Sequence, residues 1–189
     1  MSKAREALVT TALELFLHEG LQSVGIDRVI KESNVSKMTL YKYFPSKEIL
    51  IAQVLEHYHH AIIGEIQSCL VNVPPQLPQQ MAALLVWYRG KFIDSNVRGC
   101  LFGIAATVYA SCDHPIHQIC LKHKQTLADL FCALLFSAGY GERSATLALQ
   151  CLTLLEGTRN LTTIGVKGDP LASAMQVVLM LLQPQPQQG

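Results

Sequence analysis

Charged side chains are scarce in this chain: Asp, Glu, Lys and Arg make up 15% of its 189 residues, against about 25% in a typical soluble domain. The net charge at pH 7 is only +1, which excludes a uniformly basic nucleic-acid coat. Any affinity for DNA must therefore come from a local patch. Because half of the residues are hydrophobic, the shortage of charge also predicts that some apolar surface is covered in an oligomer.

Common motifs of catalysis and secretion are absent too. The sequence contains no Gly-rich phosphate loop, GxSxG elbow, HExxH motif or paired-carboxylate pattern, so we do not expect an enzyme. The six cysteines form no CxxC pair, and the first residues predict an amphipathic helix rather than a secretory leader. We therefore expect reduced thiols in a cytoplasmic protein. Glu156, Arg159 and Asp169 interrupt the longest apolar runs, which argues against a membrane span.

Helical periodicity is present along almost the whole chain. It predicts an all-α fold of about nine helices, with Gly20 ending the first and Ser46 capping a long fourth helix that runs to about residue 70. Prolines at 74, 75 and 78 mark a linker, and the tail at 184–189 is predicted to be disordered. Later helices are expected at about 81–92, 101–110, 115–137, 142–163 and 170–182.

Residues 26–44 carry the most informative pattern. They predict two short helices around a tight turn, in which Asn34 tolerates the left-handed conformation and Ser36 caps the second helix. This is a helix-turn-helix, whose second helix can enter the DNA major groove. Lysine can donate to guanine, and the methyl groups of threonine and methionine can contact that of thymine. The residues expected to bind DNA are Arg28, Lys37, Met38, Thr39, Tyr41, Lys42, Tyr43 and Lys47. Of these, Arg28, the two tyrosines and Lys47 are expected to contact phosphates.

The first fifty residues resemble the DNA-binding head of TetR/AcrR family transcriptional regulators. The resemblance rests on residues 11–16 with Gly20, on 26–29 and most densely on 35–50. It implies a three-helix DNA-binding head in residues 1–47 and a helical ligand-binding and dimerisation domain in 48–183. The expected partners are a double-stranded DNA operator, a small-molecule inducer and a second copy of the chain, with no cofactor. The expected activity is that of a repressor, released from a palindromic operator by a small apolar or aromatic inducer.

The inducer and the dimer interface are assigned to the regulatory domain. An inducer pocket should be mostly apolar with a few polar anchors, although each aromatic residue is also a candidate for ordinary core packing. The dimer is expected to form through the last two helices, which are apolar over wide faces. The candidate ligand-binding residues are Trp87, Tyr88, Phe92, Phe102, Tyr109, His117 and Phe131.

Two alternative switches on the same head stay open. Cys100 lies at a predicted helix start beside Arg98, a setting that favours a reactive thiolate and hence sensing of oxidants or electrophiles. A metal ion is the other alternative, because five side chains capable of binding one occur within twelve positions. We assign no metal ligands, and the alternative for these residues is ordinary burial. The five are Cys112, His114, His117, Cys120 and His123.

Overall fold

The computed structural model describes residues 2–95, 97 and 99–183. Within them the chain forms nine α-helices and no strand, so the expected all-α fold is confirmed. The tail at 184–189, predicted to be disordered, lies outside the described residues. The elements are α1 (Lys3–Glu19), α2 (Ile26–Ser33), α3 (Lys37–Tyr43), α4 (Lys47–Val71), α5 (Leu77–Tyr88), a π-helix (Arg89–Ile93), α6 (Leu101–Val108), α7 (Pro115–Ser137), a 3₁₀-helix (Gly141–Arg143), α8 (Ser144–Ile164) and α9 (Pro170–Leu181).

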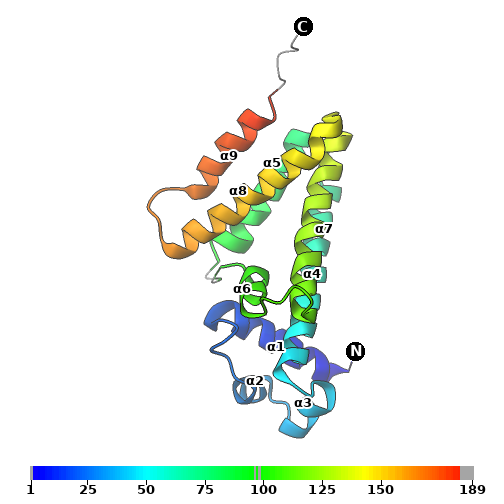
Figure 1. The fold of residues 1–189 in the computed structure, drawn as a ribbon, viewed down its shortest axis with the longest axis vertical. Helices are drawn as coiled ribbons and strands as arrows, with labels where there is room; N and C mark the ends of the chain where they lie inside the picture. Colours follow the sequence, from blue (N-terminus) through cyan, green and yellow to red (C-terminus); the bar gives the residue numbers. More distant parts are fainter. Residues whose placement is uncertain (1, 96, 98, 184–189) are drawn as a thin grey trace.

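A small head and a larger bundle share one long helix. Figure 1 shows α1, α2 and α3 together at one end of the molecule, with α5, α8 and α9 toward the other. Helix α4 begins in the head, where it packs against α1, and continues into the bundle, where it packs against α5 and α7. In residues 2–95, 97 and 99–183, no helix combines the length and the apolarity of a membrane span.

Local capping chemistry sets the helix boundaries of the head. Ser46 Oγ accepts the backbone N–H of Ile49 at 3.2 Å and begins α4, as expected of an N-cap serine. Gly20 ends α1 with φ +95°, a conformation that side chains with a Cβ rarely adopt. Apolar residues of α1, α2, α3 and the start of α4, together with Phe44 at the end of α3, are buried and form the core of the head: Leu8, Ala12, Phe16, Val29, Leu40, Phe44 and Leu50.

The bundle is built around the long pair α7 and α8, against which α4, α6 and α9 pack. Pro115 is the first residue of α7, where its missing N–H costs nothing, and His114 Nδ1 accepts the N–H of Ile116 at 3.2 Å. Both ends of the predicted helix 115–137 are confirmed. The largest buried side chains of this region include Leu101, Phe102, Ile116 and Leu135.

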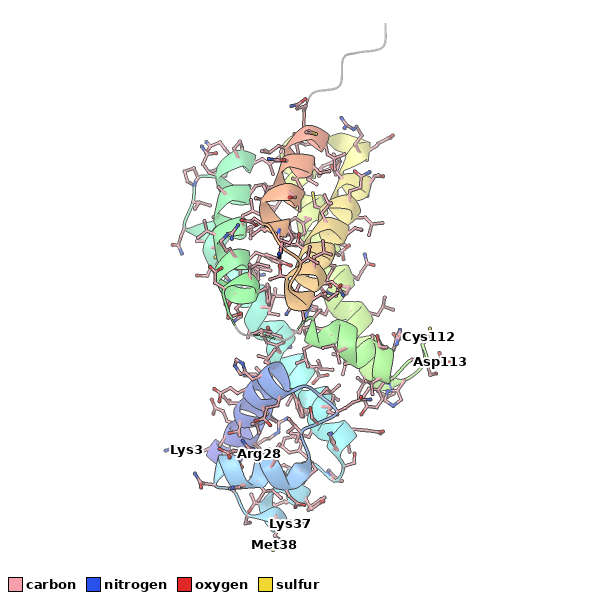
Figure 2. The ribbon with its side chains drawn as sticks, turned by 90° about the vertical axis from the view of Figure 1, so that its left-hand side faces the viewer. Lys3, Arg28, Lys37, Met38, Cys112 and Asp113 are labelled. Atoms are coloured by element: carbon pink, nitrogen blue, oxygen red, sulfur yellow. The ribbon has the colours of Figure 1, made fainter. Side chains whose placement is uncertain are left out.

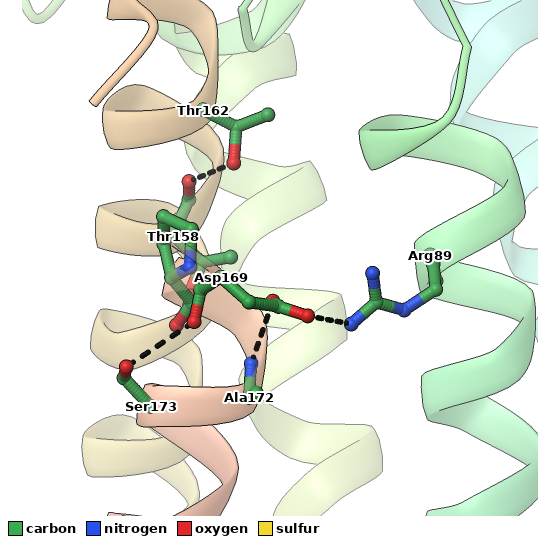
Figure 3. Close-up of polar contacts among 7 residues, drawn as sticks. Arg89, Thr158, Thr162, Asp169, Ala172 and Ser173 are labelled. Atoms are coloured by element: carbon green, nitrogen blue, oxygen red, sulfur yellow. Dashed lines mark hydrogen bonds and ion pairs between the residues drawn. The ribbon is translucent and has the colours of Figure 1, made fainter. Parts of the chain in front are cut away.

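Helix α9 is tied to the chain after α5 through its N-cap residue, Asp169. One carboxylate oxygen accepts the N–H of Ala172 at 2.9 Å, and the other accepts from Arg89 Nη2 at 2.7 Å (Figure 3). The hydrogen bond from Ala172 and then the contact with Arg89 lower the pKa of Asp169 below its ordinary value. This one carboxylate therefore caps α9 and joins it to the neighbouring helix.

The sequence placed two boundaries of α5 incorrectly. Pro78, assigned to the linker, is the second residue of α5, a position that tolerates proline. The helix expected to run to Phe92 ends as an α-helix at Tyr88 and continues for five residues as a π-helix. Such π segments are rare and occur mostly as single turns within α-helices. Here the π-helix places Phe92 against Tyr88 and Trp87, with ring centroids 5.1 and 5.5 Å apart.

Candidate functional site

The turn between α2 and α3 has the geometry that the sequence predicted. Asn34 adopts φ +54° and ψ +26°, the left-handed conformation. Ser36 Oγ then accepts the N–H of Thr39 at 3.2 Å and bonds to its hydroxyl at 2.8 Å, which fixes the first turn of α3. The result is a seven-residue helix held at a corner with α2, the arrangement of a helix-turn-helix.

Helix α3 carries the most projecting part of the head. Lys37 and Met38 lie at its tip, at the end of the molecule opposite the bundle (Figure 2). Met38 is 83% exposed although it is apolar, and the neighbouring Tyr41 and Lys42 are also exposed. A large apolar side chain so exposed is available to a partner surface, and the surrounding lysines match a polyanion.

The other predicted DNA-binding residues have partners within the head. Lys37 Nζ pairs with Asp27 at 3.2 Å, and Arg28 pairs with Glu19 at 3.3 Å and Glu32 at 3.5 Å. All of these ion pairs are at the surface, where they contribute little and exchange readily for a phosphate. Arg28 is therefore partly neutralised before any DNA arrives.

Tyr43 and Lys47 are less accessible than the sequence suggested. Ser2 Oγ donates to the hydroxyl of Tyr43 at 2.8 Å, which ties the start of α1 to the end of α3. Lys47 Nζ donates to the carbonyl oxygen of Gln22 at 3.5 Å, and burial lowers the pKa of this lysine. Both side chains are half-buried and hold neighbouring segments in place.

The bundle encloses an apolar cavity between α4, α5, α7, α8 and α9. Its free volume is about 50 Å³, room for a few water molecules, whereas small-molecule sites usually measure several hundred Å³. A ligand of ordinary size therefore requires its walls to move. The walls include two flexible methionines, and the apolar lining comprises Ile62, Ile66, Met81, Leu84, Leu85, Leu127, Leu130, Leu152, Leu155, Met175 and Val178.

Four of the seven predicted ligand residues line this cavity: Trp87, Tyr88, Phe92 and Phe131. The other three do not. Phe102 stacks between Tyr58 and His123, with ring centroids at 5.7 and 3.6 Å. Tyr109 stacks on His114, and His117 Nδ1 bonds the carbonyl oxygen of Tyr109 at 3.0 Å. Tyr109 and His117 therefore link the end of α6 to the start of α7 instead of lining the cavity.

Comparison with known proteins agrees with the helix-turn-helix geometry. Residues 8–54 match the family model for bacterial regulatory proteins of the tetR family. The uncharacterized HTH-type transcriptional regulator YxaF of Bacillus subtilis is 23% identical over 95% of each chain. A TetR-family transcriptional regulator from Streptomyces coelicolor superposes with a TM-score of 0.83 at 27% identity, over 97% of this chain and 98% of that one. A TetR transcriptional regulator from Legionella pneumophila gives 0.85 at 20% identity, over 97% and 99%.

The head of the chain is that of the tetR family, and the whole chain has the fold of TetR-family regulators. The match over residues 8–54 confirms the resemblance of the first fifty residues, and it identifies the helix-turn-helix of α2 and α3 as the DNA-binding element of a transcriptional regulator. Its relatives are regulators and not enzymes, which also agrees with the sequence.

Cys100, the candidate redox residue, is the N-cap of α6. Its Sγ accepts the N–H of Gly103 at 3.4 Å and a hydrogen bond from Lys124 Nζ at 3.3 Å. Arg98, expected beside it, lies outside the described residues. The sequence did not identify Lys124 as the cation near this thiol, because the two residues come together only through the packing of α6 against α7.

The five metal-capable residues of 112–123 are dispersed. Among the residues that the structure describes, no group of three or more His, Cys, Asp or Glu side chains could hold a metal ion. Cys112 is exposed and Cys120 is buried, and burial raises the pKa of Cys120 to about 11. His123 points instead to α4, where its Nδ1 lies 3.0 Å from that of His59.

One functional candidate was missed from the sequence. Arg159 on α8 lines the apolar cavity and is only 6% exposed. In the sequence it served only as a charge that argues against a membrane span. The signal was its spacing: Arg159 follows the cavity residues Leu152 and Leu155 by seven and four positions, and so shares their helix face.

Proposed function

We propose that this protein is a homodimeric repressor that leaves a palindromic operator when a small apolar or aromatic inducer enters the bundle cavity. Residues 1–47 form the DNA-binding domain and residues 48–183 the ligand-binding and dimerisation domain. In the DNA-binding domain Lys37, Met38, Thr39 and Lys42 read bases. The phosphate contacts come from Arg28, Tyr41, Tyr43 and Lys47.

The observation that carries this proposal is the continuity of α4. The helix is capped in the head at Ser46 and supplies Ile62 and Ile66 to the cavity wall. Because the cavity of about 50 Å³ is too small for a drug-sized ligand, a bound inducer must displace its walls. A displaced α4 moves the head, since α1 packs directly on it. The ligand then favours a dimer whose recognition helices no longer match successive major grooves.

Exposed apolar residues on the last two helices support the dimer. One α3 makes few base contacts, and two of them about 34–36 Å apart read two half-sites. Several apolar residues of the last two helices, such as Leu147, Leu152 and Val178, are instead buried in the subunit core. The apolar side chains that remain exposed, and that we assign to the interface, are Leu149, Leu161, Ile164, Val177, Leu179 and Met180.

The test is release of a selected operator from the full chain. An operator isolated from random DNA is labelled, and fluorescence anisotropy identifies a compound that releases it from the wild type. The Leu127→Phe variant fills the cavity, so it should keep operator affinity and need at least tenfold more of that compound. Leu121→Phe introduces the same side chain at an exposed position of α7 as a matched control. Equal release of wild type and Leu127→Phe would contradict the cavity as the inducer site.

Oxidation of Cys100 is the second candidate switch, favoured by the contact of its Sγ with Lys124 Nζ. A cation and a helix N-terminus beside a thiol are found at reactive cysteines. Hydrogen peroxide or N-ethylmaleimide should then release the operator from the wild type and not from Cys100→Ser. Cys112→Ser, at an exposed thiol, is the control. A full response in Cys100→Ser would reject this switch.

A further inference from the structure

Arg159 brings a positive charge into the cavity without a counter-ion. Its side chain is 6% exposed, and its Cζ lies 4.0 Å from the centroid of the Phe92 ring. No carboxylate among the described residues forms an ion pair with it. A buried charge that is not paired lowers the free energy of unfolding by roughly several kcal/mol. If this region served only as a structural core, an apolar residue would be favoured at position 159.

The two unpartnered nitrogens of Arg159 are those that best bind a carboxylate. Nε and Nη2 are both buried and have no hydrogen-bond partner in the described chain. Their N–H bonds lie parallel along one edge of the planar guanidinium group, so one carboxylate can accept both. The free edge is a complete two-pronged donor rather than a single unsatisfied atom.

A second unpartnered group lies near this edge. The hydroxyl of Tyr58 is buried and has no hydrogen-bond partner within the described residues. Burial raises the pKa of Tyr58 to about 12, and the charge of Arg159 together with a close contact between the two side chains opposes that rise. The hydroxyl is therefore a neighbour of Arg159 that lies outside the residues lining the cavity, and it remains protonated at neutral pH.

The neighbouring cations are already neutralised. Lys124 Nζ pairs with Glu156 at 2.5 Å, and Lys91 Nζ pairs with Glu65 at 2.6 Å. Arg159 alone among these three is left with a free charge. One uncompensated positive charge matches a singly charged anion and not a phosphate group, which carries about two negative charges at neutral pH.

The rest of the cavity is suited to an apolar body. Apart from Arg159, His123 and the Lys124–Glu156 pair, the wall is formed mainly by aromatic rings, aliphatic side chains and two methionines, and methionine adapts readily to ligands of different shape. The rings of Trp87 and Phe92 meet edge to face with centroids 5.5 Å apart. The other charged groups of the wall, Lys124 and Glu156, neutralise each other, so Arg159 is the cavity's one charged side chain without an ion-pair partner among the described residues.

We propose that the cavity binds a monocarboxylic acid with an apolar or aromatic body, and that Arg159 receives its carboxylate through Nε and Nη2. This rests on the proposed function, because it names the chemical class of the inducer at the same site. The acid offsets the cost of the buried guanidinium, and its body displaces the apolar walls.

The experiment uses matched pairs of an acid and its primary amide, in which only the charge differs. The probes are 3-phenylpropionate, 4-phenylbutyrate and 6-phenylhexanoate with their amides, titrated into the full chain at pH 7.5 by isothermal calorimetry. In at least one pair, the acid should bind at least tenfold more tightly than its amide. In Arg159→Met, which has a similar volume and no charge, the acid should lose this advantage while the amide binds as before.

Controls separate a ligand contact from a change in the fold. Arg89→Met also removes an arginine of the bundle, but from an exposed ion pair outside the cavity, and should retain the preference for the acid. If Arg159→Met unfolds, as judged by circular dichroism, Arg159→Lys replaces it; a single ammonium group should reduce the preference severalfold. The proposal is overturned if no acid is preferred by the wild type, or if the Arg159 variant keeps the preference.

Failure here is distinguishable from failure of the proposed function. Operator release by a neutral compound, with no acid preferred in calorimetry, leaves the ligand-responsive repressor standing and rejects the carboxylate. Tight, Arg159-dependent binding of an acid that leaves operator affinity unchanged supports the carboxylate site and contradicts induction through it.

Discussion

The Nδ1 atoms of His59 on α4 and His123 on α7 lie 3.0 Å apart between the two helices that flank the cavity. One of these nitrogens must donate and the other accept, so the hydrogen bond is lost when both rings are protonated. His123 is 2% exposed, and burial, followed by the charges of Lys124, His59 and Arg159, lowers its pKa to about 3. The pair therefore couples the packing of α4 on α7 to pH.

Acidification should destabilise the fold through this pair. Since the pKa of His123 is about 3 when folded and about 6.5 when unfolded, the unfolded chain binds more protons between these values. The free energy of unfolding therefore falls as the pH falls below about 6.5, by up to about 1.4 kcal/mol per pH unit from this residue. Urea unfolding at pH 5.0 to 7.5 measures the slope.

The matched variant for this prediction is His123→Phe, which keeps a ring stacked on Phe102 and removes the titrating group. Its free energy of unfolding should depend less steeply on pH than that of the wild type. His18→Gln, at the exposed end of α1, controls for loss of a histidine. An unchanged slope in His123→Phe would contradict the assignment.

The left-handed turn residue of the helix-turn-helix gives a second prediction. Among the described residues, Asn34 is the only one other than glycine with positive φ, a conformation that costs roughly 1–2 kcal/mol for a residue with an ordinary Cβ. Asn34→Ala should lower the free energy of unfolding by about 1 kcal/mol, whereas Asn34→Gly should change it by less than half as much. Equal losses in the two variants, measured by urea unfolding, would exclude backbone strain as the cause.

The head could be predicted closely because its boundaries depend on local chemistry. Ser36 and Ser46 cap the helices that follow them through their own side chains, and Asn34 turns the chain by its own conformation. Neither effect needs a distant partner, so residue type and spacing contain the information. The π-helix after Tyr88 is different, since it forms where aromatic rings from separate turns must pack together.

The regulatory domain was predictable only in class. Wide apolar faces on the last helices indicated burial. They did not show which apolar residues pack in the subunit core and which are exposed for a dimer interface: on α8, Leu152 is buried and Leu161 is exposed. Similarly, hydrophobicity identified Trp87 and Phe131 as cavity residues, and also selected Phe102, which packs elsewhere. Arg159 was missed because only the folded structure shows that its side chain is buried and that two of its nitrogens have no hydrogen-bond partner among the described residues.

The proposed dimer interface predicts the effect of a charge on α9. Val177 is 42% exposed and lies beside Leu161 in a surface hollow between α8 and α9. Val177→Glu places a carboxylate in each half of the interface, where burial and like-charge repulsion should weaken dimerisation at least tenfold. Analytical ultracentrifugation measures the change. Val71→Glu, at an exposed valine ending α4, should leave the dimer intact; a dimeric Val177→Glu would place the interface elsewhere.

Exposed Lys42 on the recognition helix should contribute both affinity and base preference. Its Nζ lies 6.0 Å from the Tyr43 ring centroid and forms no ion pair within the described head, unlike Arg28, which two glutamates neutralise. Lys42→Ala should weaken operator binding by about 1–3 kcal/mol and relax preference at one base pair of each half-site. Arg28→Ala should have a smaller effect that is uniform across sequences and lowers the salt dependence of binding.

Fluorescence anisotropy at several salt concentrations, on the selected operator and on single-base variants of it, separates these two effects. Lys122→Ala removes an exposed lysine from α7, outside the head, and should bind as the wild type does. If Lys42→Ala keeps both its affinity and its base preference, the side chain does not face the groove. The reading of bases would then pass to Lys37 and Met38 at the tip of α3, because these are the remaining exposed side chains of its first turn.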